Sequence, residues 1–202
     1  GAQINSESQF NGLSLYAVGS GTSIDNVAIV NGTDDGVEFF GGSVSASNFY
    51  LENNEDDAID LTEGWNGTLD GAYVLNTADF STAVEADGVN NNPTLNNLTA
   101  VSTVGGTALQ FKKASGATVS GLTLTGFDTK VELKDPDQGS FTNIQIDGAD
   151  ADDASSYNSS ALDTNQFAWA GGNSSNVVVL SGSISSDVSL DATKTYFLSG
   201  TY

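Results

Sequence analysis

The sequence predicts an all-β protein whose chain winds into a solenoid of stacked coils. Three observations lead to this prediction: short apolar runs recur every 22 to 25 residues, apolar residues keep fixed positions within each repeat, and helical periodicity is nearly absent. The 202 residues suit one domain, or one domain with an appendage. Val, Ile, Leu and Phe stand in short alternating runs, which favours ordered strands although the hydrophobic fraction is only 38%.

Six tetrapeptides mark the first strand of each repeat. They share an apolar first residue and an apolar or small third residue: LSLY at Leu13, VEFF at Val37, IDLT at Ile59, VEAD at Val84, LQFK at Leu109 and VELK at Val131. The steps between them are 24, 22, 25, 25 and 22 residues. Repeats of this length with several short strands are typical of a solenoid in which each coil stacks on the previous one.

A second column of residues supports the same alignment. About ten to thirteen residues after each tetrapeptide, an Asn or Gly precedes an apolar residue: Asn26, Asn48, Gly71, Asn97, Gly121 and Asn143. The residue two positions earlier is apolar in every repeat, from Ile24 in the first to Phe141 in the last. Both Asn and Gly tolerate positive φ, which a sharp bend between two strands requires. We therefore expect these six residues to form a bend-forming ladder along the solenoid.

The repeat resembles right-handed parallel β-helix proteins of the pectate-lyase-like superfamily. Four segments carry the resemblance, and they are similar to secreted bacterial surface β-helix proteins often labelled lipoprotein or hypothetical: LSLYAVGSGTSIDNV, DDGVEFFGGSV, NEDDAIDLTEGWNGTL and AVEADGVNNNPTLNNLTA. The resemblance implies a right-handed parallel β-helix of about six coils and an extracellular location. It implies little about activity, because this fold hosts enzymes, adhesins and passive stalks. A β-sandwich is the alternative, although sandwiches do not usually keep aligned apolar columns at a near-constant period.

Three regions follow from this alignment. We expect an N-terminal lead over residues 1–12, the β-helix over residues 13–149, and a Ser/Asn/Asp-rich segment followed by strands over residues 150–202. The last region is a capping or subunit-joining element, and its candidate subunit-joining strand contains Tyr196, Phe197 and Leu198. A terminal strand can extend the open first coil of the next subunit, and this head-to-tail addition builds a filament. The alternatives are a truncation, or a tail that folds back on its own rod.

Composition excludes several functions. The formal charge of −21 argues against nucleic acid and against anionic membrane surfaces. No run is long and apolar enough to predict membrane insertion. The absence of His and Cys disfavours zinc and copper sites, whereas abundant carboxylates make calcium the expected metal. Because the chain contains no Met, we expect a fragment or a trimmed precursor, and a secreted protein without its signal segment is the natural interpretation.

Acidic residues recur at matching positions of neighbouring coils. GTDDGVEFFGG and NEDDAIDLTEG align Asp34 and Asp35 with Asp56 and Asp57. The strand that follows contributes one outward column: Ser14, Glu38, Asp60, Glu85, Gln110 and Glu132. Like charges about 4.8 Å apart repel, so this face is either solvated, bound to cations or partly protonated.

We expect calcium at the two aspartate pairs, because carboxylate oxygens are its usual ligands. A weaker calcium candidate is DGADADD, with Asp147, Asp150, Asp152 and Asp153, which lacks the Gly and the closing Glu of an EF-hand loop.

The leading functional hypothesis is a secreted, non-enzymatic structural or cell-surface protein whose main partner is a second copy of itself. The alternative is a polysaccharide-binding or polysaccharide-cleaving β-helix. The resemblance implies that the hydrolases use clustered Asp with a His and an Arg-Lys segment, and the chain has neither His nor Arg. The resemblance also implies that the lyases pair calcium with a basic residue. None of the candidate basic residues stands beside the acid pairs in this alignment; the candidates are Lys112, Lys113, Lys130 and Lys134.

A sugar-stacking surface is the remaining expectation for the alternative function. Its candidate aromatic residues are Trp65, Trp169, Tyr16, Phe39 and Phe40, although we expect Phe39 to point into the core and Phe40 outward. No catalytic residue is assigned.

Overall fold

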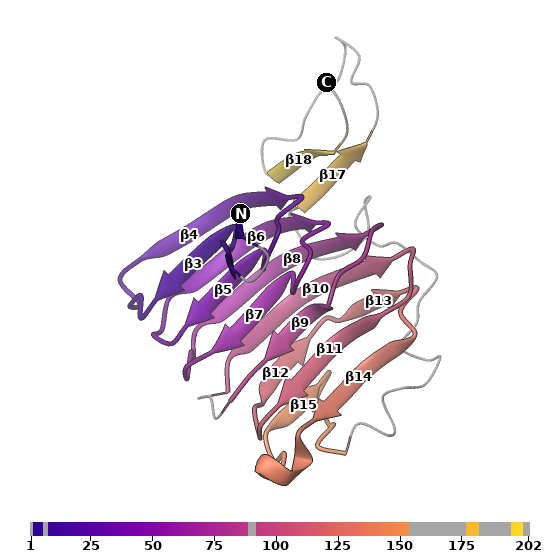
Figure 1. The fold of residues 1–202 in the computed structure, drawn as a ribbon. Helices are drawn as coiled ribbons and strands as arrows, with labels where there is room; N and C mark the ends of the chain where they lie inside the picture. The colour runs from indigo at the N-terminus through magenta and orange to yellow at the C-terminus, as the bar shows by residue number, and fades with distance from the viewer. Residues whose placement is uncertain (1, 6–7, 89–91, 154–176, 182–194, 200–202) are drawn as a thin grey trace.

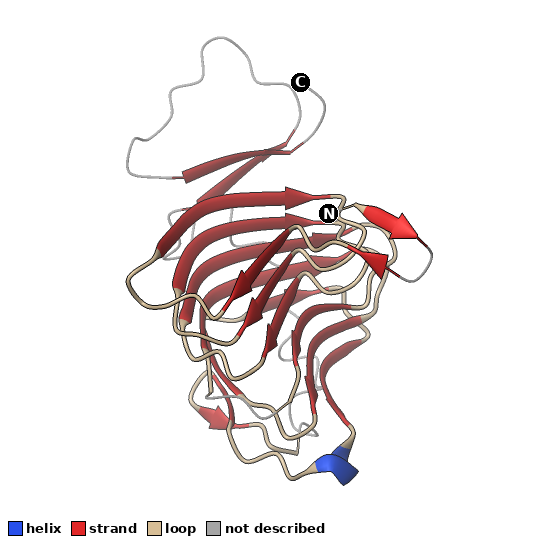
Figure 2. Ribbon diagram, turned by 60° about the vertical axis from the view of Figure 1, so that its left-hand side comes forward, coloured by secondary structure: helices blue, strands red, loops and turns tan. Residues whose placement is uncertain are grey.

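The chain folds into an all-β parallel solenoid (Figure 1). The computed structural model describes residues 2–5, 8–88, 92–153, 177–181 and 195–199. Two sheets face each other along the solenoid, and their strands alternate along the chain (Figure 2). The prediction of a parallel β-helix is confirmed.

A six-stranded sheet forms one face of the solenoid. Its strands are β3 (Leu13–Tyr16), β5 (Val37–Phe40), β7 (Ile59–Thr62), β9 (Thr82–Ala86), β11 (Thr107–Lys112) and β14 (Thr129–Lys134). They pair in parallel in the order β14-β11-β9-β7-β5-β3. Their register aligns the first residue of every tetrapeptide found in the sequence, from Leu13 to Val131. The six strands enclose about five turns, so the expected six coils are one too many.

An eight-stranded sheet forms the opposite face. Its strands are β4 (Ser23–Val30), β6 (Ser45–Glu52), β8 (Thr68–Asn76), β10 (Thr94–Ser102), β12 (Ala117–Ser120), β13 (Thr123–Thr125), β15 (Ile144–Ile146) and β16 (Ala149–Asp150). All pair in parallel except β16, which runs antiparallel along β15. The edge of this sheet at β15 is therefore covered by the chain itself.

Short elements lie at the two ends of the solenoid. An antiparallel pair, β1 (Gln3–Asn5) and β2 (Ser8–Gln9), precedes the first coil, and the 3-10 helix η1 (Pro136–Gln138) follows β14. A separate parallel pair consists of β17 (Val177–Ser181) and β18 (Thr195–Ser199). Both views place this pair beyond β4, at the N-terminal end of the solenoid (Figures 1 and 2).

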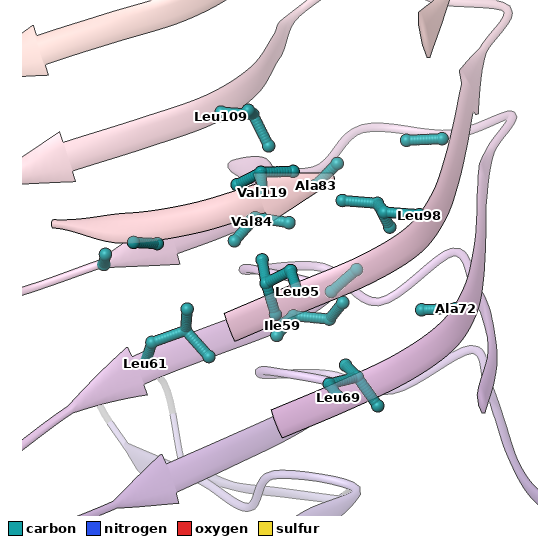
Figure 3. Packing of buried hydrophobic residues seen from close by; sticks show 14 of the residues in the cluster. Ile59, Leu61, Leu69, Ala72, Ala83, Val84, Leu95, Leu98, Leu109 and Val119 are labelled. Atoms are coloured by element: carbon teal, nitrogen blue, oxygen red, sulfur yellow. The ribbon is translucent and has the colours of Figure 1, made fainter. Parts of the chain in front are cut away.

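The core fills the space between the two sheets (Figure 3). Side chains alternate along each strand, so the first and third residues of a tetrapeptide point inward while the second points outward. Val37 and Phe39 are accordingly 0% exposed, and so are Ile59 and Leu61 in the next coil. Leu69 and Leu95 of the opposite sheet belong to the same buried cluster. Each coil thus buries its apolar columns against those of its neighbours.

The bend within each long strand of the eight-stranded sheet has a left-handed backbone conformation. Five residues of the ladder have φ between 54° and 80°: Asn26, Asn48, Gly71, Asn97 and Gly121. The Cβ of a residue replacing Gly71 would lie 3.2 Å from Asn48 Oδ1 of the preceding coil, so the column is closely stacked. Small or amide residues therefore suit this position.

The assignment of Asn143 to this ladder is wrong. Strand pairing aligns Ile146, not Phe141, with Val119, and this places Gly148, with φ 81°, opposite Gly121. The shift arises because η1 and the connection after it lengthen the last coil. The sequence period could not reveal this insertion, because Phe141 is also apolar and stands where the period predicts an apolar residue.

Candidate functional site: the acidic face of the six-stranded sheet

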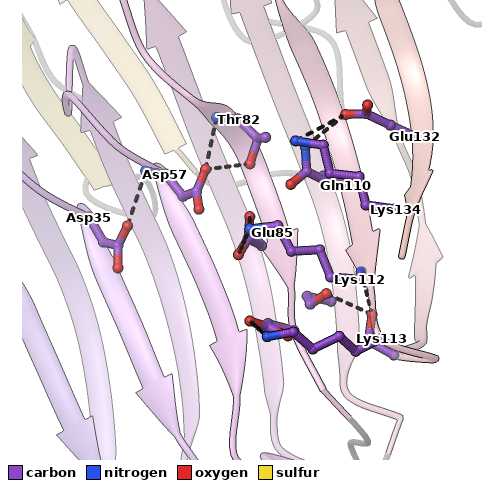
Figure 4. Close-up of polar contacts among 12 residues, drawn as sticks. Asp35, Asp57, Thr82, Glu85, Gln110, Lys112, Lys113, Glu132 and Lys134 are labelled. Carbon is purple, nitrogen blue, oxygen red and sulfur yellow. Dashed lines mark hydrogen bonds and ion pairs between the residues drawn. The ribbon is translucent and has the colours of Figure 1, made fainter. Parts of the chain in front are cut away.

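The turns before β5, β7 and β9 position the aspartate pairs. The backbone N–H of Asp57 donates to Asp35 Oδ1 at 3.0 Å, and the N–H and hydroxyl of Thr82 donate to Asp57 Oδ1 at 2.8 and 2.7 Å (Figure 4). One carboxylate therefore stabilises the same turn in the following coil. Gly36 leaves room for this stacking, because a Cβ there would lie 2.5 Å from the carbonyl oxygen of Ala58.

The outward column of the six-stranded sheet is formed as the repeat predicts. Parallel pairing aligns Glu38 with Asp60, Asp60 with Glu85, and Glu85 with Gln110. A fully solvated acidic face is wrong for the middle of this column, since Asp60 is 9%, Glu85 5% and Gln110 3% exposed. The low exposure of these outward side chains could not be read from the alternation of residues along one strand.

Burial changes the acidity of this face. Desolvation, followed by the charges of neighbouring carboxylates, raises the pKa of Asp60 to about 10. The pKa of Asp35 rises to about 8 and that of Asp57 to about 7, in both cases chiefly through desolvation. The pKa of Glu38 also rises, again mainly because the carboxyl is removed from water. Closely stacked acids avoid repulsion by retaining protons.

The column contains three buried oxygens without a hydrogen-bond partner among the described residues: Asp60 Oδ1, Glu85 Oε2, which lies beside Lys112 Nζ, and Gln110 Oε1. Asp35, Glu38 and Asp60 each offer a carboxylate oxygen, and these oxygens lie within 4.8 Å of one another. The trio can share a proton, and its oxygens also have the chemistry of a cation site.

Two lysines neutralise the next part of the face, which the alignment of coils did not predict. Lys112 Nζ donates to Glu85 Oε1 at 2.7 Å, and Lys113 Nζ lies 3.0 Å from Asp87 Oδ2 (Figure 4). These contacts run diagonally between neighbouring coils. Strand pairing puts Gln110 opposite Glu85, so Lys112 reaches back from a position two residues beyond Gln110. The expectation concerned the aspartate pairs, and Lys112 contacts Glu85 instead, although its charge also acts on Asp57 of one pair. A search for diagonal pairs would have found it.

The aspartate pairs come together much as the repeat suggests. Asp34, Asp35 and Asp56 offer carboxylate oxygens within 4.8 Å of one another, and burial, followed by the charge of Asp56, raises the pKa of Asp34. Asp57 is not in this trio, and its Oδ1 accepts the hydrogen bonds of Thr82. Carboxylate oxygens at this spacing are the donor set that calcium prefers.

The second calcium candidate has a different local structure. Asp147 Oδ1 accepts the N–H of Gly121 at 2.7 Å, and Asp152 Oδ1 accepts the N–H of Ile144 at 2.8 Å. Asp150 lies in β16, where it pairs with Gln145. Asp147 thus holds a backbone amide of the preceding coil, and Asp152 holds one of the last coil. Calcium at this segment stays a prediction.

The candidate subunit-joining strand is part of β18. Its three residues pair in parallel with β17 of the same chain: Tyr196 with Val178, Phe197 with Val179 and Leu198 with Leu180. One edge of the strand is therefore occupied within the chain. A role in joining subunits stays a prediction, and it would use the other edge.

The aromatic residues divide between the core and the surface. Tyr16 is 69% exposed and stacks on Phe40, with ring centroids 4.2 Å apart, beside the acidic column. Trp65 is 0% exposed, stacks on Phe39 at 4.1 Å and donates to the carbonyl oxygen of Val44 at 3.0 Å, so its expected sugar-stacking role is wrong. Trp169 lies outside the described residues.

Comparison with protein families agrees with this architecture. The family model described as "Pectate-lyase like beta helix domain" matches residues 1–176. The chain belongs to this pectate-lyase-like β-helix family. Searches of curated proteins and of solved structures return no match to the chain. Among the described residues, no helix has the length and hydropathy needed to cross a membrane. Family membership explains the coiled backbone and leaves the chemistry to the residues on its faces.

Proposed function

We propose that this β-helix is a secreted, non-enzymatic structural protein of the cell surface or extracellular space, which assembles end to end into filaments by terminal strand complementation. The exposure of the core at the first coil carries the proposal. Val27 and Ile29 are partly exposed, whereas Phe49 and Leu51, which follow them in the same columns, are 0% exposed. An apolar column that ends at a surface is completed when another coil stacks on it.

Further apolar side chains gather at the same end of the chain. Ile4 is 57%, Phe10 61% and Tyr16 69% exposed. Exposed apolar side chains concentrated in one part of a chain are available for an interface, whereas singly exposed ones are normal. A second copy is a suitable partner, because its coils have the same repeat and the same strand spacing. The −21 charge keeps rods apart laterally and so favours contact at the ends.

The hydrogen bonds of the aspartate pairs support a structural role. Asp35 and Asp57 each bind a backbone amide of the next coil, which holds successive turns together. A carboxylate engaged in this way is a poor nucleophile or base, because it must keep its position and its hydrogen bonds. The repeated acids are explained by stacking without any reaction.

Microscopy of the purified full-length chain tests assembly. We expect negative-stain images and light scattering to reveal linear particles longer than one solenoid, with lengths that increase with protein concentration. Added salt is expected to promote lateral association, because it screens the acidic flanks. Discrete monomers at every salt and calcium concentration would reject the proposal.

We propose calcium as a ligand of the trio formed by Asp34, Asp35 and Asp56. Their three oxygens lie within 4.8 Å of one another, and bound calcium would offset the repulsion between them. Calcium titration by calorimetry measures this binding, with Asp34→Asn as the test variant and Asp79→Asn, at an exposed position, as the control. Equal binding by both variants would remove this site.

A second candidate function is polysaccharide binding or cleavage on the acidic face. It is favoured by the buried, unpartnered Oδ1 of Asp60 and by the exposed Tyr16–Phe40 stack beside it. A glycosidase site needs two carboxyl groups at a suitable separation, and an aromatic ring beside them offers a surface on which a sugar can pack. A screen for reducing ends and unsaturated products on neutral and acidic polysaccharides tests it. Activity that Asp60→Asn abolishes would move this candidate ahead of the structural role.

A further inference from the structure

The two sheets end differently. In the eight-stranded sheet, β16 runs along β15 at one end, and both views place the β17–β18 pair beyond β4 at the other (Figures 1 and 2). In the six-stranded sheet, β3 pairs only with β5 and β14 only with β11, as far as the described residues go. Both edges of the six-stranded sheet therefore present unpaired backbone groups, which a further strand can bind.

The register of the sheet determines what a further strand would meet. Parallel pairing carries one column from Leu13 to Val131 and another from Leu15 to Leu133. If β3 of a second copy continues this register beyond β14, its Leu13 faces Val131 and its Leu15 faces Leu133. Leu13 and Leu133 are both partly exposed and pack against the core at opposite ends. The contact would complete both inward columns.

The outward residues also match in this register. Ser14 of the second copy faces Glu132. Because Ser14 is uncharged, the carboxylate of Glu132 meets no second acid there. Tyr16 faces Lys134, whose side chain is 46% exposed. One face of the Tyr16 ring already stacks on Phe40, so Lys134 would cover the opposite face in a cation–π contact.

The lysines distinguish the two ends of the six-stranded sheet. Lys112 is the first lysine in the sequence, and four of the five lysines stand in or directly after the last two strands of this sheet: Lys112, Lys113, Lys130 and Lys134. The strands at the other end carry no lysine, and Glu38 is the outward acid nearest to β3. Head-to-tail stacking therefore brings Lys134 to the lysine-free end of this sheet in the next copy. Head-to-head stacking would join two lysine-free ends of the sheet.

We propose that the end-to-end contact is a parallel pairing of β3 of one copy with β14 of another, with Leu13 opposite Val131. The partner is a second copy of this chain. The inference rests on the filament proposed above, and it places the contact at β3 and β14 instead of at the candidate joining strand in β18. The six-stranded sheet then runs continuously through the filament. Because the two surfaces differ, the contact does not close on itself and can be repeated without limit.

Cysteine cross-linking tests the register directly, because the chain contains no Cys. Full-length Ser14→Cys and Glu132→Cys variants are mixed, oxidised and separated on a non-reducing gel. Opposed residues in neighbouring strands lie about 4.8 Å apart, within the Cα separation of a disulfide. Ser14→Cys mixed with Lys134→Cys is the control, because a two-residue offset increases the separation to about 8 Å, beyond disulfide reach.

The expected result is a strong dimer band for Ser14→Cys with Glu132→Cys, a weak one for the offset control, and none for either variant alone. Linear particles without the in-register band would overturn this contact and leave filament assembly intact. Equal bands for both mixtures, or a dimer of Ser14→Cys alone, would overturn the register or the orientation. Discrete monomers with no band would overturn the contact and the proposed function together.

Discussion

Stability should fall as pH rises, because the folded protein retains protons that the unfolded chain releases. The pKa of Asp60 rises from 3.8 to about 10 on folding. Between these values the folded state binds one more proton than the unfolded state, so the free energy of unfolding decreases by about 1.4 kcal/mol per pH unit. The contribution is fully present below pH 3.8 and is lost as pH rises through about 10.

The magnitude is large compared with the stability of a domain. One retained proton lowers the free energy of unfolding by about 4 kcal/mol from pH 5 to pH 8, while whole domains are stable by about 5–15 kcal/mol. Asp35, with a pKa raised to about 8, and Asp57, raised to about 7, act in the same direction over the lower part of this range. The three groups interact, so their effects do not simply add.

Urea unfolding at pH 5, 6, 7 and 8, followed by tryptophan fluorescence, measures this dependence. Asp60→Asn preserves the shape of the protonated acid, and we expect it to remove about 1.4 kcal/mol per pH unit from the slope. Asp79→Asn changes the same charge at an exposed position and should leave the slope unchanged. A wild-type stability that is constant or rises from pH 5 to pH 8 would refute the reasoning.

Three further predictions concern the turns that hold the coils together. Asp57→Ala leaves the buried amide of Thr82 without its acceptor and should cost about 1–3 kcal/mol in urea unfolding, while Asp57→Asn, which keeps an acceptor, should cost less. Gly67→Ala should destabilise by about 1–3 kcal/mol, because its Cβ would lie 1.9 Å from the carbonyl oxygen of Val44, whereas Gly19→Ala, with open space around it, should be nearly neutral. Equal losses at the two glycines would contradict this close approach. Calcium at about 100 times its dissociation constant should raise the free energy of unfolding by about 2.7 kcal/mol. Asp34→Asn should abolish this increase, whereas Asp79→Asn, at an exposed position, should not.

Predicting the coil from sequence worked because burial imposes the same pattern on every repeat. Val37, Ile59 and Val84 must all point inward, and a strand shifted by one residue would turn its apolar side chains outward. The alignment failed only in the last coil, where the connection after β14 moves Ile146 into the place expected of Phe141. An insertion between repeats changes the register of the strands. It leaves an apolar residue at the expected position, so the apolar pattern does not reveal the insertion.

The sequence by itself determined the solenoid, the stacking of Asp34 and Asp35 with Asp56 and Asp57, and the order of the acids along the face. Period and alternation suffice for this, because both can be read along the chain without knowing which side chains are in contact. Tertiary structure alone decided how buried Asp60 is and which lysine Glu85 meets. Burial and diagonal contacts depend on side chains from coils about 25 residues apart, and these side chains determine whether a column of acids is solvated, protonated or paired.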